Sequence, residues 1–366
     1  MNNDIQIRKL PPVWFIKALN TFRSWLLLLN LRLFPGNLVL YEHFQYFWLL
    51  PCLRVAAELD IAGIIKDKPL TISELAIKTR TDPQYLFRIM RALTSNGIFK
   101  PRKDGKYSNS PMSKALIDGK GSLRYMIMQH LGNFNWGTFN ELIHAVRTGN
   151  DAVTKVYGKG IYDYLSEHPD ESELFTRSMS NLSELSIEPI LNVYDFSKCG
   201  IIADIGGGEG LLLSAILHEY PGLKGILFDR KESITKAESI FIKFGVKEKI
   251  KTIPGDFFES APDGADVYLL KNILHNWSDE DCVRILNTIK KVLPGKGKIL
   301  IIEMVINEDN KPSFSKLIDI QMMVFMKGGK ERTRSEYETI LTNAGFRINK
   351  IIPTIAPISI IEAIKL

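Results

Sequence analysis

Short apolar runs alternate with helical stretches from residue 200 to the end of the chain. Runs that are apolar on both faces are typical of buried parallel strands. Two later runs, Arg347–Ile352 and Ile358–Leu366, are joined by a Pro-containing turn and suit an antiparallel pair at one edge. The pattern therefore predicts an α/β fold with a mostly parallel sheet. The predicted parallel strands are Ile201–Ile205, Gly225–Phe228, Ile250–Ile253, Val267–Leu270 and Ile299–Met304.

The first third of the chain has the pattern of short helices followed by a hairpin. Thr71–Glu74 is a capping box that predicts the start of one helix. Asp82 and Pro83 predict the start of a second, with Asp82 as the cap and Pro83 in the first turn. The stretch Ile98–Ser108 predicts a hairpin. This order of two helices and a wing is typical of a winged-helix fold.

The length of 366 residues favours two domains. We place a helical and winged-helix domain at residues 1–116 and an α/β domain at 117–366, of which 117–195 is helical. The three cysteines are scattered and form neither a C-x-x-C pair nor a disulfide framework, which favours a reducing, cytoplasmic location. With six histidines and no H-E-x-x-H motif, we expect no metal site.

Residues 24–53 are rich in Leu, Phe, Trp and Tyr. Charged residues and a proline interrupt this segment, so we expect no stable membrane insertion and no signal peptide. Two interpretations remain: a buried helix pair, or contact with a membrane surface. Because large apolar stretches usually mark interfaces, we also expect a homodimer.

A glycine-rich loop follows the first predicted strand. It contains Gly206, Gly208 and Gly210 and leads into a helix, an arrangement that lets the backbone approach a ligand at the helix N-terminus. Its spacing does not match the dinucleotide fingerprint, and it lacks the Gly-Lys-Ser/Thr of a phosphate loop. Asp204 lies just before the glycines, which disfavours a polyanion and favours a cofactor with an ammonium group.

Two further acids follow the next two strands. Asp229 ends the second strand, where a carboxylate can accept both hydroxyls of a ribose, and Asp256 follows the third. Phe257 is next to Asp256 and can stack on a base. Each Asp alone is more often a turn or cap residue. Three at the ends of successive parallel strands predict a cofactor site, because ligands bind at that edge of such sheets.

These motifs resemble the class I S-adenosylmethionine-dependent O-methyltransferases of the caffeic acid and hydroxyindole O-methyltransferase type. The resemblance implies a Rossmann-like, seven-stranded methyltransferase sheet and an N-terminal winged-helix dimerisation domain. It also implies an enzyme that methylates a hydroxyl of a small, largely apolar metabolite. The motifs that carry it are Asp204–Gly210, Phe228–Asp229, Gly255–Phe258, Leu270–Glu280 and Gly328–Thr333.

The resemblance also implies roles for single residues. It places Asp229 on the ribose, Asp256 on the adenine amino group, Phe257 beside the ring and Lys271 on the methionine carboxylate. It implies that His275 is the general base and that Glu303 and Glu331 flank it. Of these two acids we expect Glu303 to bind the second ring nitrogen, because the stretch from His275 to Glu303 has the family spacing and the stretch on to Glu331 is shorter.

The acceptor pocket is predicted from methionines. Met322 and Met326 lie before the Gly328–Gly329 turn, and Met179 matches a pocket methionine of the family. A Met-rich stripe is often plain core, but Met also suits pliable binding surfaces. Plant relatives often carry a His where this chain has Leu182, which disfavours a lignin-type phenylpropanoid. We therefore expect an aromatic, polyketide or terpenoid hydroxyl as the acceptor.

The charge distribution raises one alternative. The first 116 residues hold 17 basic and 8 acidic side chains, an excess of cations that suits nucleic acid or an anionic surface. The predicted recognition helix, however, offers only Arg88 and Arg91 as exposed cations, so we expect no nucleic-acid partner. The alternatives to O-methylation are a winged-helix regulator, N- or C-methylation, and a non-methylating reaction with the same cofactor.

Overall fold

The computed structural model describes residues 10–366, so the first nine residues of the predicted N-terminal domain lie outside it. The chain divides into two compact units. The described part of the first consists of residues 10–24, 141–161 and 183–366, and the second of residues 25–140 and 162–182. Three helices have residues in both units: α1 (Val13–Leu33), α12 (Ile161–Glu167) and α13 (Pro169–Val193).

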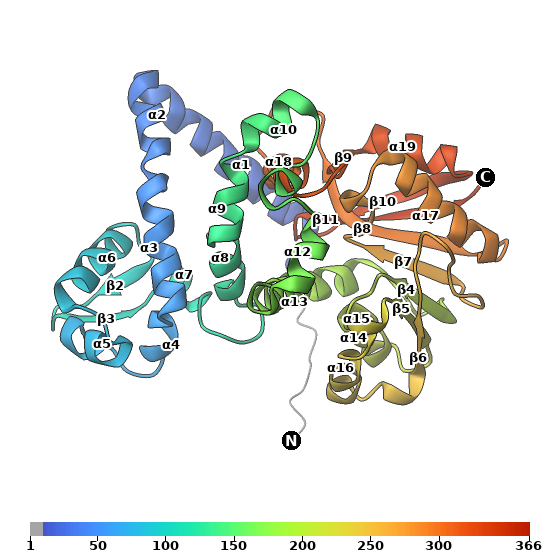
Figure 1. Cartoon of the computed structure of the whole chain (residues 1–366), viewed down its shortest axis with the longest axis horizontal. Helices are drawn as coiled ribbons and strands as arrows, with labels where there is room; N and C mark the ends of the chain where they lie inside the picture. The colour runs from blue at the N-terminus through green and yellow to red at the C-terminus, as the bar shows by residue number, and fades with distance from the viewer. Residues whose placement is uncertain (1–9) are drawn as a thin grey trace. The chain divides into compact units, whose positions relative to one another are not determined.

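The first unit is built on a mixed sheet with the strand order β10-β11-β8-β7-β4-β5-β6, and the short β9 pairs with β8 (Figure 1). The strands from β8 to β6 are parallel, whereas β11 is antiparallel to both β8 and β10. The predicted parallel sheet with an antiparallel edge is thus confirmed, and each predicted boundary is at most two residues from the observed one. The strands are β4 (Ile201–Ile205), β5 (Lys224–Asp229), β6 (Ile250–Pro254), β7 (Val267–Lys271), β8 (Lys298–Ile306), β9 (Arg332–Thr333), β10 (Phe346–Pro353) and β11 (Ile358–Lys365).

Apolar side chains point outward from both faces of this sheet, and helices cover both faces. One core joins the end of α13, α14 and α16 to the sheet, and a second joins α17 and α19 to the other face. The helices of this unit are α10 (Leu142–Thr148), α11 (Ala152–Tyr157), α14 (Leu211–Glu219), α15 (Lys231–Ile234), α16 (Ala237–Phe244), α17 (Asp279–Val292), α18 (Phe314–Phe325) and α19 (Arg334–Asn343), with the 3-10 turns η1 (Lys247–Lys249) and η2 (Leu274–Asn276).

The strand order determines where a ligand can bind. From β4 the chain continues to β5 and β6 on one side and then returns to β7 and β8 on the other. The order therefore reverses between β4 and β7. Ligands of open α/β sheets bind at the carboxyl ends of the strands beside such a switch point.

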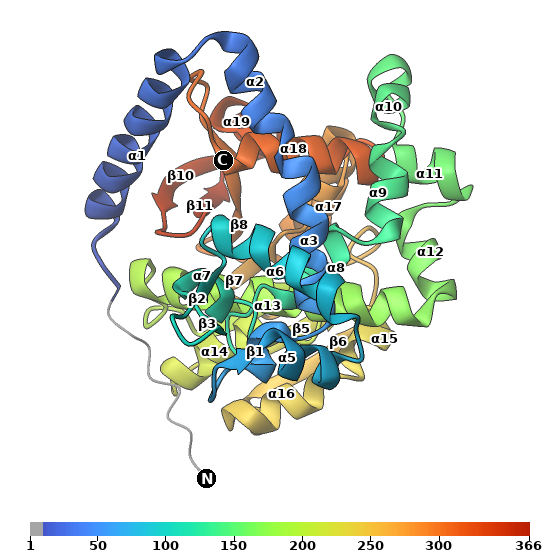
Figure 2. The same ribbon diagram turned by 90° about the vertical axis from the view of Figure 1, so that its left-hand side faces the viewer.

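The second unit contains the predicted winged element. Thr71 and Glu74 form the predicted capping box, and Asp82 caps the next helix with Pro83 in its first turn. Figure 2 shows the three short strands beside α5 and α6. The elements are α2 (Gly36–Phe44), α3 (Tyr46–Glu58), α4 (Ile61–Ile64), β1 (Leu70–Thr71), α5 (Ile72–Thr79), α6 (Pro83–Ser95), β2 (Phe99–Pro101), β3 (Lys106–Asn109), α7 (Pro111–Lys114), α8 (Arg124–His130) and α9 (Asn133–Phe139).

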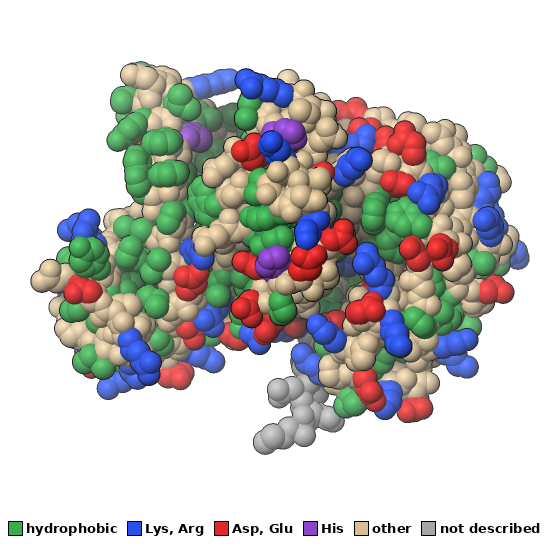
Figure 3. Space-filling model, in the orientation of Figure 1, with side chains coloured by type: hydrophobic (Ala, Val, Ile, Leu, Met, Phe, Trp, Pro, Cys, Tyr) green, Lys and Arg blue, Asp and Glu red, His purple; other side chains and the backbone are tan. Residues whose placement is uncertain are grey.

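The interpretation of residues 24–53 as a buried helix pair is wrong for the single chain. Neither α1 nor α2 contains a buried residue, and Leu33 and Leu40 are 66% and 73% exposed. Hydrophobic side chains gather over α2 and the adjoining part of α3 (Figure 3). Both helices are rich in apolar residues, and the rest of the chain does not pack closely enough against them to bury any of these side chains. Within residues 10–366 no helix is both long and apolar enough to cross a membrane.

Candidate active site

The glycine loop after β4 needs glycine for its backbone conformation. Gly206, Gly208 and Gly210 have φ angles of 66°, 60° and 73°, which side-chain-bearing residues rarely adopt. A Cβ on Gly206 would also lie 2.5 Å from Cδ1 of Ile273, whereas a Cβ on Gly208 would meet no atom within 4 Å. The loop is therefore packed on one side and open at Gly208, where a ligand can approach the N-terminus of α14.

Asp229 at the end of β5 is bound to this loop. Its Oδ2 accepts a hydrogen bond from the Gly208 amide at 2.7 Å, and its Oδ1 accepts one from the Arg230 amide at 2.6 Å. The carboxylate is half-buried. Because its position is fixed by backbone donors, its outer lone pairs have a defined direction at the carboxyl edge of the sheet.

Asp204 lies beneath the glycine loop. A Cβ on Gly207 would sit 2.6 Å from its carboxyl carbon. Burial raises the pKa of Asp204 to about 7, although the charge of Lys271 opposes this. Burial likewise lowers the pKa of Lys271 to about 8, while Asp204 opposes that shift, and the Lys271 Nζ donates to Ser183 Oγ at 3.1 Å. The ends of β4 and β7 thus carry an acid and an ammonium group that interact across the switch point.

Asp256 and Phe257 follow β6. Asp256 is exposed, and its Oδ1 accepts a hydrogen bond from the Phe258 amide at 2.8 Å, so it stabilises a turn. Phe257 packs edge-on against Trp277, with ring centroids 6.1 Å apart. Its Cε1 lies 3.5 Å from the position of a Cβ on Gly206. The structure therefore brings the Phe257 ring next to the glycine loop.

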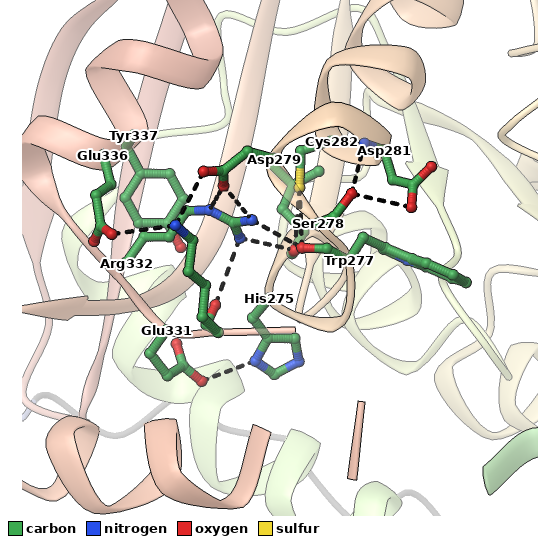
Figure 4. A network of polar contacts seen from close by, with 12 residues as sticks. His275, Trp277, Ser278, Asp279, Asp281, Cys282, Glu331, Arg332, Glu336 and Tyr337 are labelled. Carbon is green, nitrogen blue, oxygen red and sulfur yellow. Dashed lines mark hydrogen bonds and ion pairs between the residues drawn. The ribbon is translucent and has the colours of Figure 1, made fainter. Parts of the chain in front are cut away.

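His275 lies in η2, the turn that follows β7. Its Nδ1 points at Oε1 of Glu331 (Figure 4), at a distance of 2.8 Å. The His275 side chain is 14% exposed. An ionised carboxylate only accepts hydrogen bonds, so Nδ1 carries the proton and Nε2 keeps a free lone pair. This is the tautomer that a histidine needs in order to accept a proton at Nε2.

The predicted pairing of His275 with Glu303 is wrong. Oε1 of Glu303 accepts from the backbone amides of Ile273 and His275, at 2.9 and 3.2 Å, and its Oε2 accepts from the Tyr337 hydroxyl at 2.5 Å. Glu303 thus binds the main chain of residues 273–276, the histidine turn, and Glu331 binds the His275 ring. The pairing of β9 with β8 places Glu331 there, and such a contact between distant segments cannot be read from residue spacing.

The surroundings of the His275 ring alter its proton affinity. Burial lowers the pKa of His275, but the hydrogen bond to Glu331 and the charges of Glu303 and Glu331 together raise it above its ordinary value. Burial raises the pKa of Glu331, against the effect of His275. The pair is therefore suited to accept and hold one additional proton.

The Gly328–Gly329 turn and the strand after it hold the histidine turn from the other side. A Cβ on Gly329 would lie 2.9 Å from the His275 carbonyl oxygen, and the Lys330 amide donates to that oxygen at 2.9 Å. The buried Arg332 guanidinium donates to the carbonyls of Leu274 and Trp277 and pairs with Asp279 (Figure 4). The close approach explains why glycine is needed at position 329.

Sequence reasoning did not single out three residues of this network: Arg332, Tyr337 and Ser183. Arg332 lies within the Gly328–Thr333 motif, and this position is the sequence feature that could have pointed to it. Tyr337 and Ser183 stand in helical stretches with no distinguishing pattern.

The predicted pocket methionines are only partly brought together. Met322 is buried on α18, and Met326 follows that helix as its C-cap, half-buried. The Met326 Cβ would lie 2.5 Å from a Cβ on Gly329, so Met326 is next to the turn that packs on His275. Met179 lies on the part of α13 that belongs to the second unit, and its role stays a prediction.

The sheet order, the glycine loop and the acids at the strand ends define an S-adenosylmethionine-dependent methyltransferase. The O-methyltransferase domain model matches residues 139–347, and the O-methyltransferase dimerisation domain model matches residues 41–119. The chain belongs to the O-methyltransferase family.

Relatives match nearly the whole chain. It is 34% identical over 330 residues to the phenazine O-methyltransferase PhzM of Lysobacter antibioticus, a match that covers 90% of this chain and 96% of the relative. It is 33% identical to the mitomycin biosynthesis 6-O-methyltransferase of Streptomyces lavendulae, over 87% of this chain and 91% of the relative. The structure of human N-acetylserotonin methyltransferase in complex with S-adenosylmethionine matches with a TM-score of 0.83 and 26% identity, covering 91% of this chain and 98% of that chain.

The residues present fit the family's cofactor. The glycine loop leaves open space at Gly208, and carboxylates end β4 and β5 beside it. Such a donor and acceptor set suits a nucleoside carrying both an ammonium and a carboxylate group. The protein is therefore an S-adenosylmethionine-dependent O-methyltransferase of the type found in secondary metabolism.

Proposed function

We propose that this enzyme methylates a hydroxyl group of a small, largely apolar aromatic or polyketide-like metabolite, with His275 as the general base. The observation that carries this proposal is the His275–Glu331 pair in the turn after β7, in which Glu331 binds Nδ1 and leaves Nε2 to accept a proton. The bound S-adenosylmethionine supplies an electrophilic methyl group on a sulfonium. The chain itself must then make the acceptor oxygen nucleophilic.

His275 makes the oxygen nucleophilic by taking its proton at Nε2. A phenol-like hydroxyl has a pKa of about 10 and an imidazolium about 6.5, so full deprotonation beforehand is uphill by roughly 3.5 units, or about 5 kcal/mol. The raised pKa of His275 narrows this gap. Glu331 stabilises the imidazolium that forms, and alignment of the acceptor supplies further acceleration.

We assign the cofactor contacts to residues at the ends of β4 to β7. Asp229 holds the ribose, Asp256 the adenine amino group, Phe257 lies beside the adenine ring, and Lys271 contacts the methionine carboxylate. The glycine loop and Asp204 complete the site on the ammonium side. The positions of these residues around the switch point support the assignment.

Replacing Asp229 by Ala is expected to weaken S-adenosylmethionine binding by about 1.5–3 kcal/mol, because charge-assisted hydrogen bonds to the ribose are lost. Isothermal titration calorimetry measures this directly. Asp195→Ala is the matched control, since it removes a carboxylate that likewise accepts a hydrogen bond from a backbone amide, that of Ser197. Equal affinities for parent and Asp229→Ala would remove Asp229 from the site.

The pH dependence follows from the raised pKa of His275. Because the base must be neutral, kcat/KM falls as the pH drops through that pKa, and we expect its acid limb to have a midpoint above 6.5. Glu331→Gln removes a charge that raises this pKa, so the midpoint moves to lower pH. The surface variant Glu338→Gln should leave it unchanged, and an unchanged midpoint in Glu331→Gln would contradict the assignment.

The remaining assignments concern the domains and the acceptor. Residues 1–116 form the dimerisation domain of a cytoplasmic homodimer, and residues 117–366 form the catalytic domain, in which 117–195 lines the acceptor pocket. Met179, Met322 and Met326 contact the acceptor. The match of residues 41–119 to the dimerisation domain supports this division.

The chain is expected to be a dimer at micromolar concentration because α1 and α2 expose large apolar side chains. Leu33→Glu combined with Leu40→Glu should shift it towards monomer in light scattering. Ile77→Glu is the matched control, since Ile77 is 79% exposed but lies on α5 and not on α1 or α2. A parental protein that is monomeric with α1 folded would contradict the expectation.

The acceptor is found by incubating the enzyme with S-adenosylmethionine labelled in its methyl group and an extract of small metabolites. Label bound through an ether oxygen supports O-methylation. Label found only on nitrogen or carbon, or none transferred by an enzyme that binds the cofactor, would overturn the proposal.

A further inference from the structure

Glu303 binds the histidine turn through its main chain. Its side chain is fully buried on β8, and its carboxylate accepts from two backbone amides, those of Ile273 and His275. A buried carboxylate is stable only if it is well hydrogen-bonded. The two amides meet part of that need, and the Tyr337 hydroxyl meets the rest.

The turn itself is held in an uncommon backbone conformation. Asn272, the residue between β7 and the histidine turn, has a φ of 54°. A left-handed residue other than glycine persists only where its surroundings enforce it. Here the Asn272 amide donates to the Ile302 carbonyl, and the Asn276 side chain donates to the Asn272 carbonyl. His275 lies in a 3-10 turn of only three residues, which provides few backbone hydrogen bonds of its own. The hydrogen bond from the His275 amide to Glu303 is therefore a main anchor of the His275 backbone.

Tyr337 is positioned to hold Glu303 rigidly. It is fully buried on α19, whose start is fixed by a capping box between Thr333 and Glu336. Burial and the charge of Glu303 raise the pKa of Tyr337 far above its ordinary value. The hydroxyl therefore stays protonated at neutral pH and donates to Glu303.

We propose that Tyr337 is a positioning residue of the methyl-transfer reaction: by donating to Glu303 it fixes the backbone of the histidine turn and so holds the His275 ring against Glu331. The inference rests on the proposed role of His275 as the base. Tyr337 acts only through Glu303 and the turn, with no contact to the reacting atoms.

The test is Tyr337→Phe, which removes one oxygen atom and keeps the ring in the core. Tyr268→Phe is the matched control, because Tyr268 on β7 is as fully buried as Tyr337 and its hydroxyl donates to the Pro262 carbonyl at 2.7 Å instead of to Glu303. Both variants lose one buried hydrogen bond. A purely structural role would therefore affect both alike.

Two measurements are made on each variant with saturating S-adenosylmethionine. The first is the nitrogen NMR titration of the His275 ring, one of six histidines, assigned with His275→Gln. The second is kcat for the acceptor found in the methylation screen. In Tyr337→Phe the His275 ring should lose its fixed Nδ1–H tautomer, its pKa should fall towards the ordinary value, and kcat should drop roughly tenfold to a hundredfold, since a misplacement of about 1 Å costs on the order of 10²-fold. In Tyr268→Phe both should match the parent.

The proposal is overturned if Tyr337→Phe keeps the parental His275 titration and kcat, or if Tyr268→Phe loses as much kcat. Failure of the proposed function looks different, because His275→Ala would then retain activity. The NMR titration needs no acceptor, so it reports on the histidine turn whether or not His275→Ala retains activity.

Discussion

Replacing His275 by Ala should lower kcat by about 10²–10⁴-fold, the usual effect of removing a general base. The affinity for S-adenosylmethionine should stay within a few-fold. His275 pairs with Glu331, whereas the residues assigned to the cofactor lie at the glycine loop and at Lys271. Steady-state kinetics at saturating substrate measure the first effect, and calorimetry measures the second.

The acceptor's own acidity separates base catalysis from a structural role of the histidine. An acceptor already ionised at neutral pH needs no base, so His275→Ala should slow its methylation less than that of a phenol or alcohol. His218→Ala is the control, because its Nδ1 is likewise bound to an oxygen atom, the Phe244 carbonyl, outside the site. A folded His275→Ala variant that binds cofactor and methylates a phenol at the parental rate would show that the mechanism is wrong.

The sheet could be predicted from the sequence because its central strands are buried on both faces. Such strands are apolar along most of their length, so the run Ile201–Ile205, interrupted only by Asp204, marks β4 without any tertiary information. The caps at Thr71 and Asp82 were predictable for a related reason, since a cap is a local interaction within four residues. The glycine loop was predictable because its backbone excludes other residues.

The features that were not predictable depend on contacts between distant segments. Which acid binds the His275 ring depends on how β9 lies beside β8, and residue counts do not determine this. The donation of Tyr337 to Glu303 spans 34 positions and depends on how α19 packs on the sheet. Apolar content predicted burial of α1 and α2, but the single chain buries no residue of either helix.

The largest stability effect is expected at Arg332, whose side chain is 0% exposed. Its guanidinium donates to the carbonyls of Leu274 and Trp277, which lie in or next to the histidine turn, at 2.9 and 2.8 Å. The guanidinium forms an ion pair with Asp279. Asp279 is partly exposed, so water can solvate its carboxylate when Arg332 is removed. The carbonyl groups are the critical partners, because without Arg332 they lose a charged donor in a site with little access to water.

Arg332→Met should therefore lower the free energy of unfolding by about 2–5 kcal/mol, since each buried group left unsatisfied costs roughly 1–3 kcal/mol. Methionine keeps most of the side-chain length, so the loss reports on hydrogen bonds more than on packing. Arg334→Met is the matched control: Arg334 lies two residues away and forms an exposed pair with Glu338, which contributes only about 0.3–0.5 kcal/mol. Urea unfolding followed by fluorescence measures both variants. Equal midpoints for Arg332→Met and Arg334→Met would mean that the buried guanidinium does not hold the histidine turn.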